Sequence, residues 1–269
     1  MKELRDFAGA VSIVVSSCDA FFDAWRPFAF FFRKFWPDCP FPVNLIVNEL
    51  SVRSDFVRAI AVGEDRGWAS NMQSALRRIE TPYVLYFQED YFLTGPVNEA
   101  QLASDIAYAM EQDAASFCFC DLSLLEPEFG RSTDERFALM PDVSKGRTRL
   151  QVTLWNRDTL ASLLVPGENA WQMEARGSER TCGLRMFSYA RQDAVPIRYL
   201  MSAIVRGLWT PEALALCRAH HFEIRPHFRS ALRAGKAARR WARAMGRAHY
   251  QLARWRQGNA PIALDSYAP

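Results

Sequence analysis

The sequence predicts an α/β fold with a mostly parallel β-sheet and helices on both faces. Apolar, β-branched runs alternate with longer helix-like segments over roughly the first third of the chain, a pattern typical of such folds. Acidic residues stand directly after several of these runs. The chain has 269 residues, 49% of them apolar, which is sufficient for a large core.

The individual elements follow in chain order. Val11–Cys18 is a β-branched run of the kind found in buried central strands. A helix is expected from about Phe22 to Trp36, and Pro37, Pro40 and Pro42 then mark a loop. The next expected elements are strands over Val43–Asn48 and Val57–Val62, a helix over Trp68–Ile79 and a strand over Tyr83–Phe87.

The second half of the sequence is less regular. Glu126–Lys145 is polar and is expected to be a loop. The remaining predictions are helices near Gln101–Glu111, Arg157–Leu164 and Pro211–Ala219, and strands near Ser116–Leu122, Leu150–Trp155 and Ile197–Val205.

Four carboxylates follow predicted strands, namely Asp19, Asp65, Glu89 and Asp90. Ligands of parallel sheets bind beyond the carboxyl ends of the strands, so these acids are expected to converge on a site. Glu89 and Asp90 suit Mg²⁺ or Mn²⁺, which prefer hard oxygen ligands together with substrate phosphates. The alternative for this dipeptide is a solvated acidic turn.

The cysteines and the N-terminus indicate a cytoplasmic location. Six cysteines are present without a CxxC pair, so free thiols are expected, and Cys118 and Cys120 should share one face of a strand. Met1–Asp6 contains acids, and the apolar run Val11–Val15 is too short for a secretory signal or a membrane span.

One segment carries a family resemblance. Tyr83–Leu93, read as YVLYFQEDYFL, resembles the DxD-type segment of GT-A glycosyltransferases, in the variant QEDYFL. Further similarity lies in Trp68–Ile79, Val11–Asp19, Trp25–Phe28, Trp36–Pro40, Leu150–Asn156, Glu168–Glu174 and Ile204–Trp209. The resemblance covers roughly residues 10 to 225, and the group is bacterial and serves cell-surface polysaccharide assembly.

The resemblance implies a GT-A-like fold and transfer of a sugar from a nucleotide-sugar donor to a glycan or lipid-linked acceptor. It places Asp19 and Asp65 near the base and ribose of the donor, and Asp90 with Glu89 at the metal and diphosphate. Gln88 stands where a strict DxD motif has its first acid. The implied organisation is a nucleotide-sugar half over about 1–122 and an acceptor half over 123–224.

An inverting transfer also needs a general base, which takes the proton of the acceptor hydroxyl. Glu168 and Glu174 are the candidates, in a segment opened by Pro166–Gly167, and Glu168 is slightly favoured. Trp171 lies between them and is expected either to stack on an acceptor sugar or to pack in the core.

Residues 225–269 are expected to form a basic amphipathic tail. Ten arginines and lysines lie between Glu223 and Asp265 without an acid, so the rest of the chain has a net charge of −7 against +3 for the whole. Trp241, Met245, Leu252 and Trp255 recur at helical spacing. We expect 225–256 to bind an anionic membrane surface, making the protein peripheral at the inner face of the cytoplasmic membrane. The alternative is packing of this helix on its own domain.

Two other functions compete with glycosyl transfer. A sugar nucleotidyltransferase on a similar fold usually has a Gly-rich, basic loop after the first strand, and Ser16–Phe22 contains neither glycine nor lysine. A non-enzymatic basic adaptor for membranes or nucleic acid would not require the carboxylates. Nucleic acid is not expected as a partner, because the rest of the chain is acidic and has no recognisable nucleic-acid-binding module.

Overall fold

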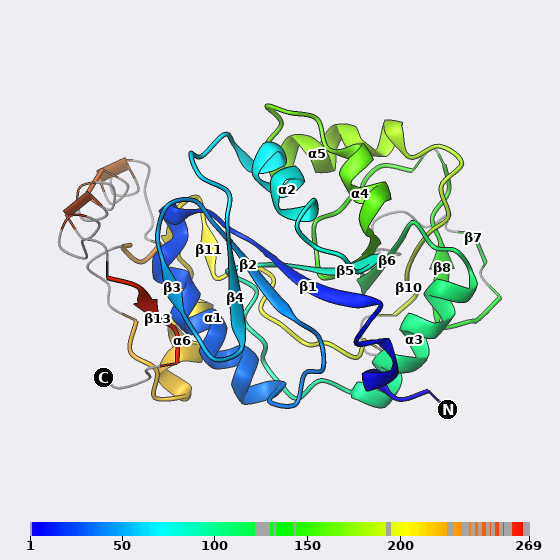
Figure 1. The fold of residues 1–269 in the computed structure, drawn as a ribbon, viewed down its shortest axis with the longest axis horizontal. Coiled ribbons are helices and arrows are strands. Elements are labelled where there is room, and N and C mark those ends of the chain that lie inside the picture. The colour runs from blue at the N-terminus through cyan, green and yellow to red at the C-terminus, as the bar shows by residue number, and fades with distance from the viewer. Residues whose placement is uncertain are drawn as a thin grey trace.

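The fold centres on one nine-stranded sheet with the strand order β4-β2-β1-β5-β9-β6-β10-β8-β7 (Figure 1). The computed structural model describes residues 2–121, 130, 131, 133–142, 144–191, 195–224, 229–232, 237, 240, 241, 244, 245, 248, 251, 252, 255 and 260–265. The strands of this sheet are β1 Val11–Ser16, β2 Val43–Val47, β4 Val57–Ala61, β5 Tyr83–Gln88, β6 Ser116–Asp121, β7 Gly130–Arg131, β8 Phe137–Leu139, β9 Thr153–Asn156 and β10 Met186–Tyr189.

The strands β4, β2, β1 and β5 run parallel, as the sequence predicts. β9 then pairs antiparallel with both β5 and β6, and β10 again runs parallel to β6. In the register of β1 and β5, Val11 lies opposite Tyr83 and Ser16 opposite Gln88, so both strands end side by side. The residues after Ser16 and after Gln88 therefore emerge at the same edge of the sheet.

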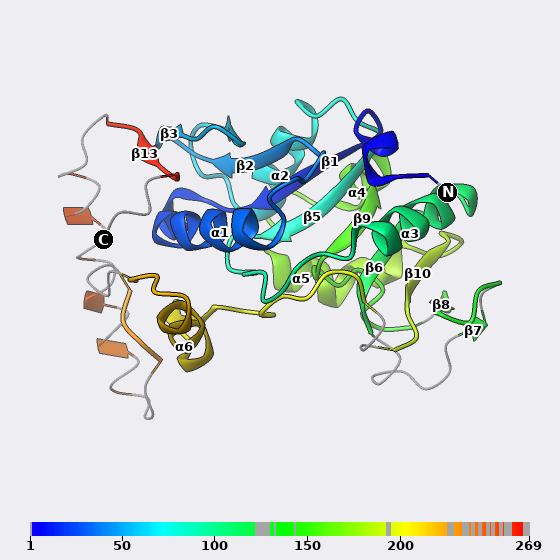
Figure 2. The same ribbon diagram turned by 90° about the horizontal axis from the view of Figure 1, so that it is seen from below.

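Helices cover both faces of the sheet. One core contains side chains of α1, α3 and α6 with alternate strand residues such as Ile13 and Phe87, and the other contains α2 and α4 with Val14 and Tyr86. Figure 2 shows α1 and α3 together on one side of the sheet. The helices are α1 Phe22–Phe35, α2 Trp68–Leu76, α3 Glu99–Glu111, α4 Arg157–Leu163, α5 Ala170–Arg176 and α6 Pro211–Ala219, with 3₁₀ turns η1 Leu4–Phe7, η2 Asp19–Phe21 and η3 Gly177–Arg180. Among the described residues, every helix is too short or too polar to span a membrane.

Burial of the sheet on both faces explains why central strands appear as apolar runs in the sequence. β1 is buried on both sides, because Ile13 and Val15 point to one core and Val14 to the other. Cys118 and Cys120 of β6 share one core, as predicted, while Phe117 and Phe119 join the other. The described cysteines are free thiols.

The second half departs from the prediction in several places. The segment expected to be a loop contributes β7 and β8, which form the far edge of the sheet, and β10 is an additional strand. The strand expected over Leu150–Trp155 starts later, at Thr153. Of the strand expected near Ile197–Val205, only β11, Ile204–Val205, forms, and it pairs with β12, Leu208–Trp209, in a small hairpin.

The C-terminal residues are joined to the domain at two points. Ala231 pairs with Trp209, and β13, Ile262–Ala263, pairs in parallel with β3, Val52–Arg53. Residues 229–232 and 260–265 therefore contact the domain, whereas the sequence was interpreted as a separate tail from residue 225 onward. The described positions between 237 and 255 are helical.

Candidate functional site

Glu89 and Asp90 follow β5 directly and are buried, at 7% and 5% exposure. The Asp90 carboxylate accepts a hydrogen bond from the backbone N–H of Ile204 at 3.0 Å, which joins β5 to the β11–β12 hairpin. Burial raises the pKa of Asp90 to about 6, although this hydrogen bond acts against the rise. Burial and the charge of Asp90 raise the pKa of Glu89 well above its usual value. This pair is not a solvated acidic turn.

Several carboxylates converge around Cys18, which lies just after β1. The pKa of the Cys18 thiol is raised to about 12, mainly by burial and in addition by the negative charges of Glu89, Asp65 and Asp19. Three acids from three different strand ends therefore lie within electrostatic reach of one side chain. This agrees with the expected grouping of Asp19, Asp65 and Glu89, whose roles stay predictions, and Cys18 was not among the predicted residues.

Asp19 is buried, and its carboxylate is occupied by the backbone of the loop after β2. Oδ1 accepts from the N–H of Asn48 at 2.8 Å, and Oδ2 accepts from those of Glu49 and Leu50 at 2.9 and 3.0 Å. The Asp19 N–H donates in return to the side-chain oxygen of Asn48 at 3.0 Å. Asp19 thus fixes the relative position of the two loops that follow β1 and β2.

Asp65 lies on the exposed loop before α2 and shapes the start of that helix. Its Oδ1 accepts from the Gly67 N–H at 3.0 Å and from the Asn71 side-chain amide at 2.8 Å. Gly67 has a φ of 87°, a conformation that side chains with a Cβ rarely adopt. The loop is fastened to β1 because the indole N–H of Trp68 donates to the Ser16 hydroxyl at 2.9 Å.

Glu168 is held in a bidentate ion pair with Arg180, with N–O distances of 3.1 and 2.8 Å. Hydrogen bonding to Arg180 lowers the pKa of Glu168. A carboxylate with a lowered pKa is a weaker proton acceptor, so this geometry does not favour Glu168 as a general base.

Glu174 is connected to the acidic pair by hydrogen bonds through Leu150, a connection that is not seen for Glu168 among the described residues. Its Oε1 accepts from the Leu150 N–H at 2.8 Å, and the Leu150 carbonyl accepts from the Gln88 amide at 3.3 Å and from the Tyr91 hydroxyl at 2.5 Å. The negative charge of Glu174 contributes to the raised pKa of Tyr91, after burial and the neighbouring tyrosines Tyr86 and Tyr199. Gln88 and Tyr91 flank Glu89 and Asp90, so Leu150 links Glu174 to the end of β5.

Trp171 lies in the first turn of α5 and is 81% exposed. The expectation that it packs in the core is therefore wrong. Asn169 caps α5 through a reciprocal pair of hydrogen bonds with Gln172, so Glu168 lies just before the helix and Glu174 within it. An exposed indole between the two acids leaves one large apolar face open to a ligand.

Arg229 and Asp23 belong to this edge and were not predicted. Arg229 forms an ion pair with Asp23 and donates to the carbonyls of Ala20 at 2.9 Å and Gly207 at 3.2 Å. Its guanidinium lies 4.7 Å from the ring centroid of Phe21. Its positive charge lowers the pKa of both Glu89 and Asp90, against the effect of burial. In the sequence Arg229 is one of ten basic residues of the C-terminal stretch, and nothing distinguishes it from the others.

The chemistry of the acidic pair fits a hard divalent cation. Burial raises the pKa of both adjacent carboxyls, and the positive charge of Arg229 only partly offsets that rise. A bound cation would favour their ionised forms further. Among the described residues, no three His, Cys, Asp or Glu side chains cluster as metal ligands. Mg²⁺ and Mn²⁺ are often held by one or two carboxylates, with water and substrate phosphates completing the shell.

Neither a protein-family model nor a curated protein matches the chain. Among solved structures, TarS 1–349 from S. aureus is similar over 92% of this chain and 74% of its own, at 13% identity and a TM-score of 0.46. TarS 1–349 in complex with UDP-GlcNAc is similar over 70% and 58%, at 13% identity and a TM-score of 0.43. A CMP:2-keto-3-deoxy-manno-octonic acid synthetase complexed with CTP is similar over 79% and 98%, at 12% identity and a TM-score of 0.45. Likeness at this level carries no argument about substrate or reaction.

Proposed function

We propose that the protein is a glycosyltransferase that moves a sugar from a nucleotide-sugar donor to a glycan or glycolipid acceptor. The observation that carries the proposal is the buried Glu89–Asp90 pair at the carboxyl end of β5, within a group of carboxylates from neighbouring strand ends. An edge of this kind is where parallel α/β sheets bind their ligands. The proposed context is the assembly of bacterial cell-surface polysaccharide.

The donor is proposed to lie along the ends of β1, β2 and β5. Asp19 supports the base pocket by fixing the loop at Asn48–Leu50, since its own oxygens are already occupied by backbone amides. Asp65 faces solvent and can accept from a ribose hydroxyl through Oδ2, which takes no hydrogen bond from the described residues. The diphosphate then lies beside Glu89 and Asp90.

A divalent cation, Mg²⁺ or Mn²⁺, held by Asp90 and Glu89 would neutralise the charge that develops on the departing diphosphate. The chain contributes the rest of the electrostatic environment. Arg229 places a positive charge beside the pair, and the N–H of Ile204 fixes the Asp90 carboxylate. Burial excludes water from both acids, which strengthens their interaction with a bound charge.

For an inverting transfer we assign the base to Glu174. Its carboxylate takes the proton of the acceptor hydroxyl while that oxygen bonds to the anomeric carbon and the bond to the diphosphate breaks. Glu168 is assigned a positioning role, because Arg180 holds it and its backbone carbonyl accepts from the Ala69 N–H of α2 at 3.3 Å. Trp171 is proposed to stack on the acceptor sugar through its exposed indole.

The test is calorimetry and thermal shift with UDP, GDP, CMP and TDP and with the triphosphates UTP, GTP, CTP and TTP, each with and without Mn²⁺. One nucleotide should bind the wild type in a Mn²⁺-dependent way, and Asp90→Asn should lose the Mn²⁺ dependence. Asp38→Asn is the matched control, since Asp38 is exposed on the loop between α1 and β2. Preferential binding of a nucleoside triphosphate would favour a nucleotidyltransferase, and folded protein that binds no nucleotide would contradict both enzymatic functions.

A further inference from the structure

The C-terminal stretch is fastened at both ends to the domain. At one end the Leu232 N–H donates to the Trp209 carbonyl at 2.6 Å, and Arg229 is bound to Asp23. At the other end the Asp265 carboxylate accepts from the Ser54 hydroxyl and the Asp55 N–H, both at 2.9 Å. Figures 1 and 2 both place the described positions between these anchors at the end of the molecule that carries β3 and β13.

The apolar residues at the described helical positions of this stretch fall on one side, which Arg240 and Gln251 border. At about 100° per residue, Trp241, Met245, Leu252 and Trp255 fall within an arc of roughly 90°. The same face includes Ala244 and Ala248. We call these residues the Trp241–Trp255 face.

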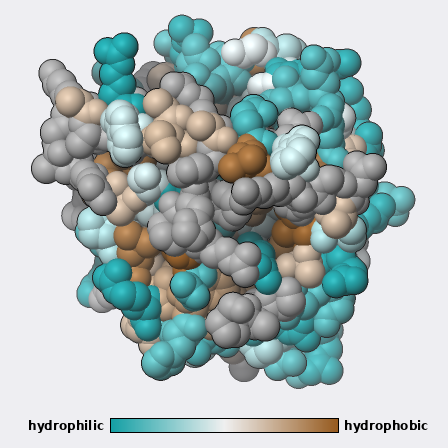
Figure 3. All heavy atoms as spheres, turned by 90° about the vertical axis from the view of Figure 1, so that its left-hand side faces the viewer, coloured by the Kyte–Doolittle hydropathy of each residue, from teal (hydrophilic) through white to brown (hydrophobic). Residues whose placement is uncertain are grey.

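This face is not covered by the protein's own domain. Trp241 is 70% exposed, Leu252 42% and Trp255 78%, while Met245 is partly buried. Figure 3 looks onto this end of the molecule. Two indoles exposed to this degree on one helical face indicate an external partner, since isolated exposed apolar residues are common but aligned ones mark interaction sites.

The charge of the stretch selects the partner. Ten arginines and lysines and no acid lie between Glu223 and Asp265, and of the two that the structure describes, Arg229 is bound to Asp23. Basic side chains are attracted to an anionic lipid surface by its negative potential. Tryptophan favours the boundary between headgroups and acyl chains, because its ring is apolar and its N–H is polar.

We propose that the Trp241–Trp255 face docks on the surface of an anionic lipid bilayer and lies in the interface without crossing it. The attachments of the stretch at Arg229 and Asp265 then orient the domain relative to the bilayer. Arg229 lies at the start of the stretch and its charge also acts on Glu89 and Asp90. The proposal concerns binding alone and is independent of the proposed glycosyl transfer.

The experiment is flotation of the full chain with phosphatidylcholine vesicles, with and without phosphatidylglycerol. The wild type should float with the anionic vesicles, fail to float with neutral ones, and be released by salt, which screens the attraction. The double variant Trp241→Ser/Trp255→Ser should bind at least tenfold more weakly. Trp171→Ser is the matched control, because Trp171 is an equally exposed tryptophan on α5, and it should bind like the wild type.

Three outcomes would overturn the proposal. The first is undiminished vesicle binding by the double variant, with its fold confirmed by circular dichroism. The second is a wild type that binds duplex DNA at the same salt concentration but no vesicle. The third is a dimer in light scattering that the double variant converts to a monomer, since this would assign the face to a second copy of the chain.

Discussion

Arg229 binds both carboxylate oxygens of Asp23, with Nε–Oδ2 and Nη2–Oδ1 distances of 3.0 and 2.9 Å. The two residues are 206 positions apart in the chain, and their side chains are only 10% and 6% exposed. The pair joins the C-terminal stretch to the first turn of α1. It also places the guanidinium beside Glu89 and Asp90.

Replacing Arg229 by alanine should destabilise the protein by about 3–5 kcal/mol, because Asp23 is then left buried without its partner. Arg229→Lys should recover only part of this, since an ammonium group cannot reproduce the two-pronged contact. Urea unfolding measures both effects. Arg58→Ala, at an exposed position of β4, is the control and should change stability by less than about 0.5 kcal/mol. A similar, small loss for Arg229→Ala would contradict the structural role of the pair.

Asp90→Asn should stabilise the protein at pH 8 while removing its function. Burial raises the pKa of Asp90 from 3.8 to about 6. Between about pH 4 and pH 6 the folded protein therefore keeps a proton that the unfolded chain releases. Stability of the wild type therefore falls as the pH rises from about 4 to about 6. The asparagine avoids this cost, a gain on the order of 3 kcal/mol at pH 8 and little near pH 4.

Thermal unfolding from pH 4 to pH 8 measures this difference. The gap between Asp90→Asn and the wild type should open with rising pH, and the exposed control Asp38→Asn should show no such trend. Added Mn²⁺ should stabilise the wild type at pH 8 more than Asp90→Asn. A gap that is the same at both pH values would show that the Asp90 charge is not costly in the fold.

Glu174→Gln should reduce sugar transfer by about 10²–10⁴-fold, the usual contribution of a general base. The measurement is release of nucleoside diphosphate from the donor that the nucleotide screen identifies, with donor affinity determined separately. Glu168→Gln should weaken the contact with Arg180 and have a smaller effect on the rate at saturating donor. A larger rate loss in Glu168→Gln than in Glu174→Gln would return the role of base to Glu168.

The central strands of the first ninety residues were predictable because they are mostly apolar runs, whereas the two-residue strand β3 in this region was not predicted. β1 and β5 are of this kind, and their ends place Asp19, Glu89 and Asp90 at one edge. The short strands β7, β8 and β10 were not predictable. They have two to four residues each, and β8 and β10 gain their burial from pairing with distant strands rather than from a local pattern.

Site residues were predictable where function requires an acid at a strand end, and not where tertiary contacts decide. From the sequence Asp19 was predicted to contact the donor, but in the structure its carboxylate oxygens accept hydrogen bonds from the backbone of Asn48–Leu50. Glu168 and Glu174 are equivalent in the sequence, and only their partners, Arg180 and the Leu150 amide, distinguish them. Each of these partners is more than ten residues away from its acid in the chain.

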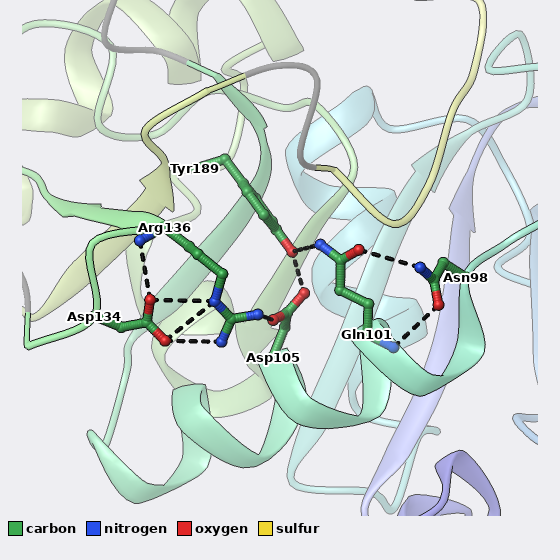
Figure 4. Close-up of polar contacts among 6 residues, drawn as sticks. All are labelled: Asn98, Gln101, Asp105, Asp134, Arg136 and Tyr189. Atoms are coloured by element: carbon green, nitrogen blue, oxygen red, sulfur yellow. Dashed lines mark hydrogen bonds and ion pairs between the residues drawn. The ribbon is translucent and has the colours of Figure 1, made fainter.

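A polar cluster around the buried Asp105 joins α3 to β10 and to the segment just before β8, on the other half of the sheet (Figure 4). Asp105 is fully buried and accepts hydrogen bonds from the Tyr189 hydroxyl and from Arg136, the latter at 2.9 Å. Arg136 also binds Asp134, and the Gln101 amide donates to the Tyr189 hydroxyl at 3.1 Å. Burial raises the pKa of Asp105 to about 6, and the hydrogen bond from Tyr189 limits that rise.

Tyr189→Phe should therefore cost more stability at high pH than at low pH. Without the hydroxyl the pKa of Asp105 rises further, so the ionised carboxylate of the folded variant is less well stabilised at high pH. Below about pH 4 the Asp105 carboxyl is neutral in the folded wild type and in the folded variant alike. We expect a loss of about 2–3 kcal/mol at pH 8 and about 1 kcal/mol at pH 4, by urea unfolding at each pH. Tyr108→Phe is the control, at a residue of α3 like Asp105, because its hydroxyl bonds to Thr133 at the surface, and its effect should not vary with pH. An equal loss for Tyr189→Phe at both pH values would mean that the hydroxyl does not stabilise the Asp105 charge.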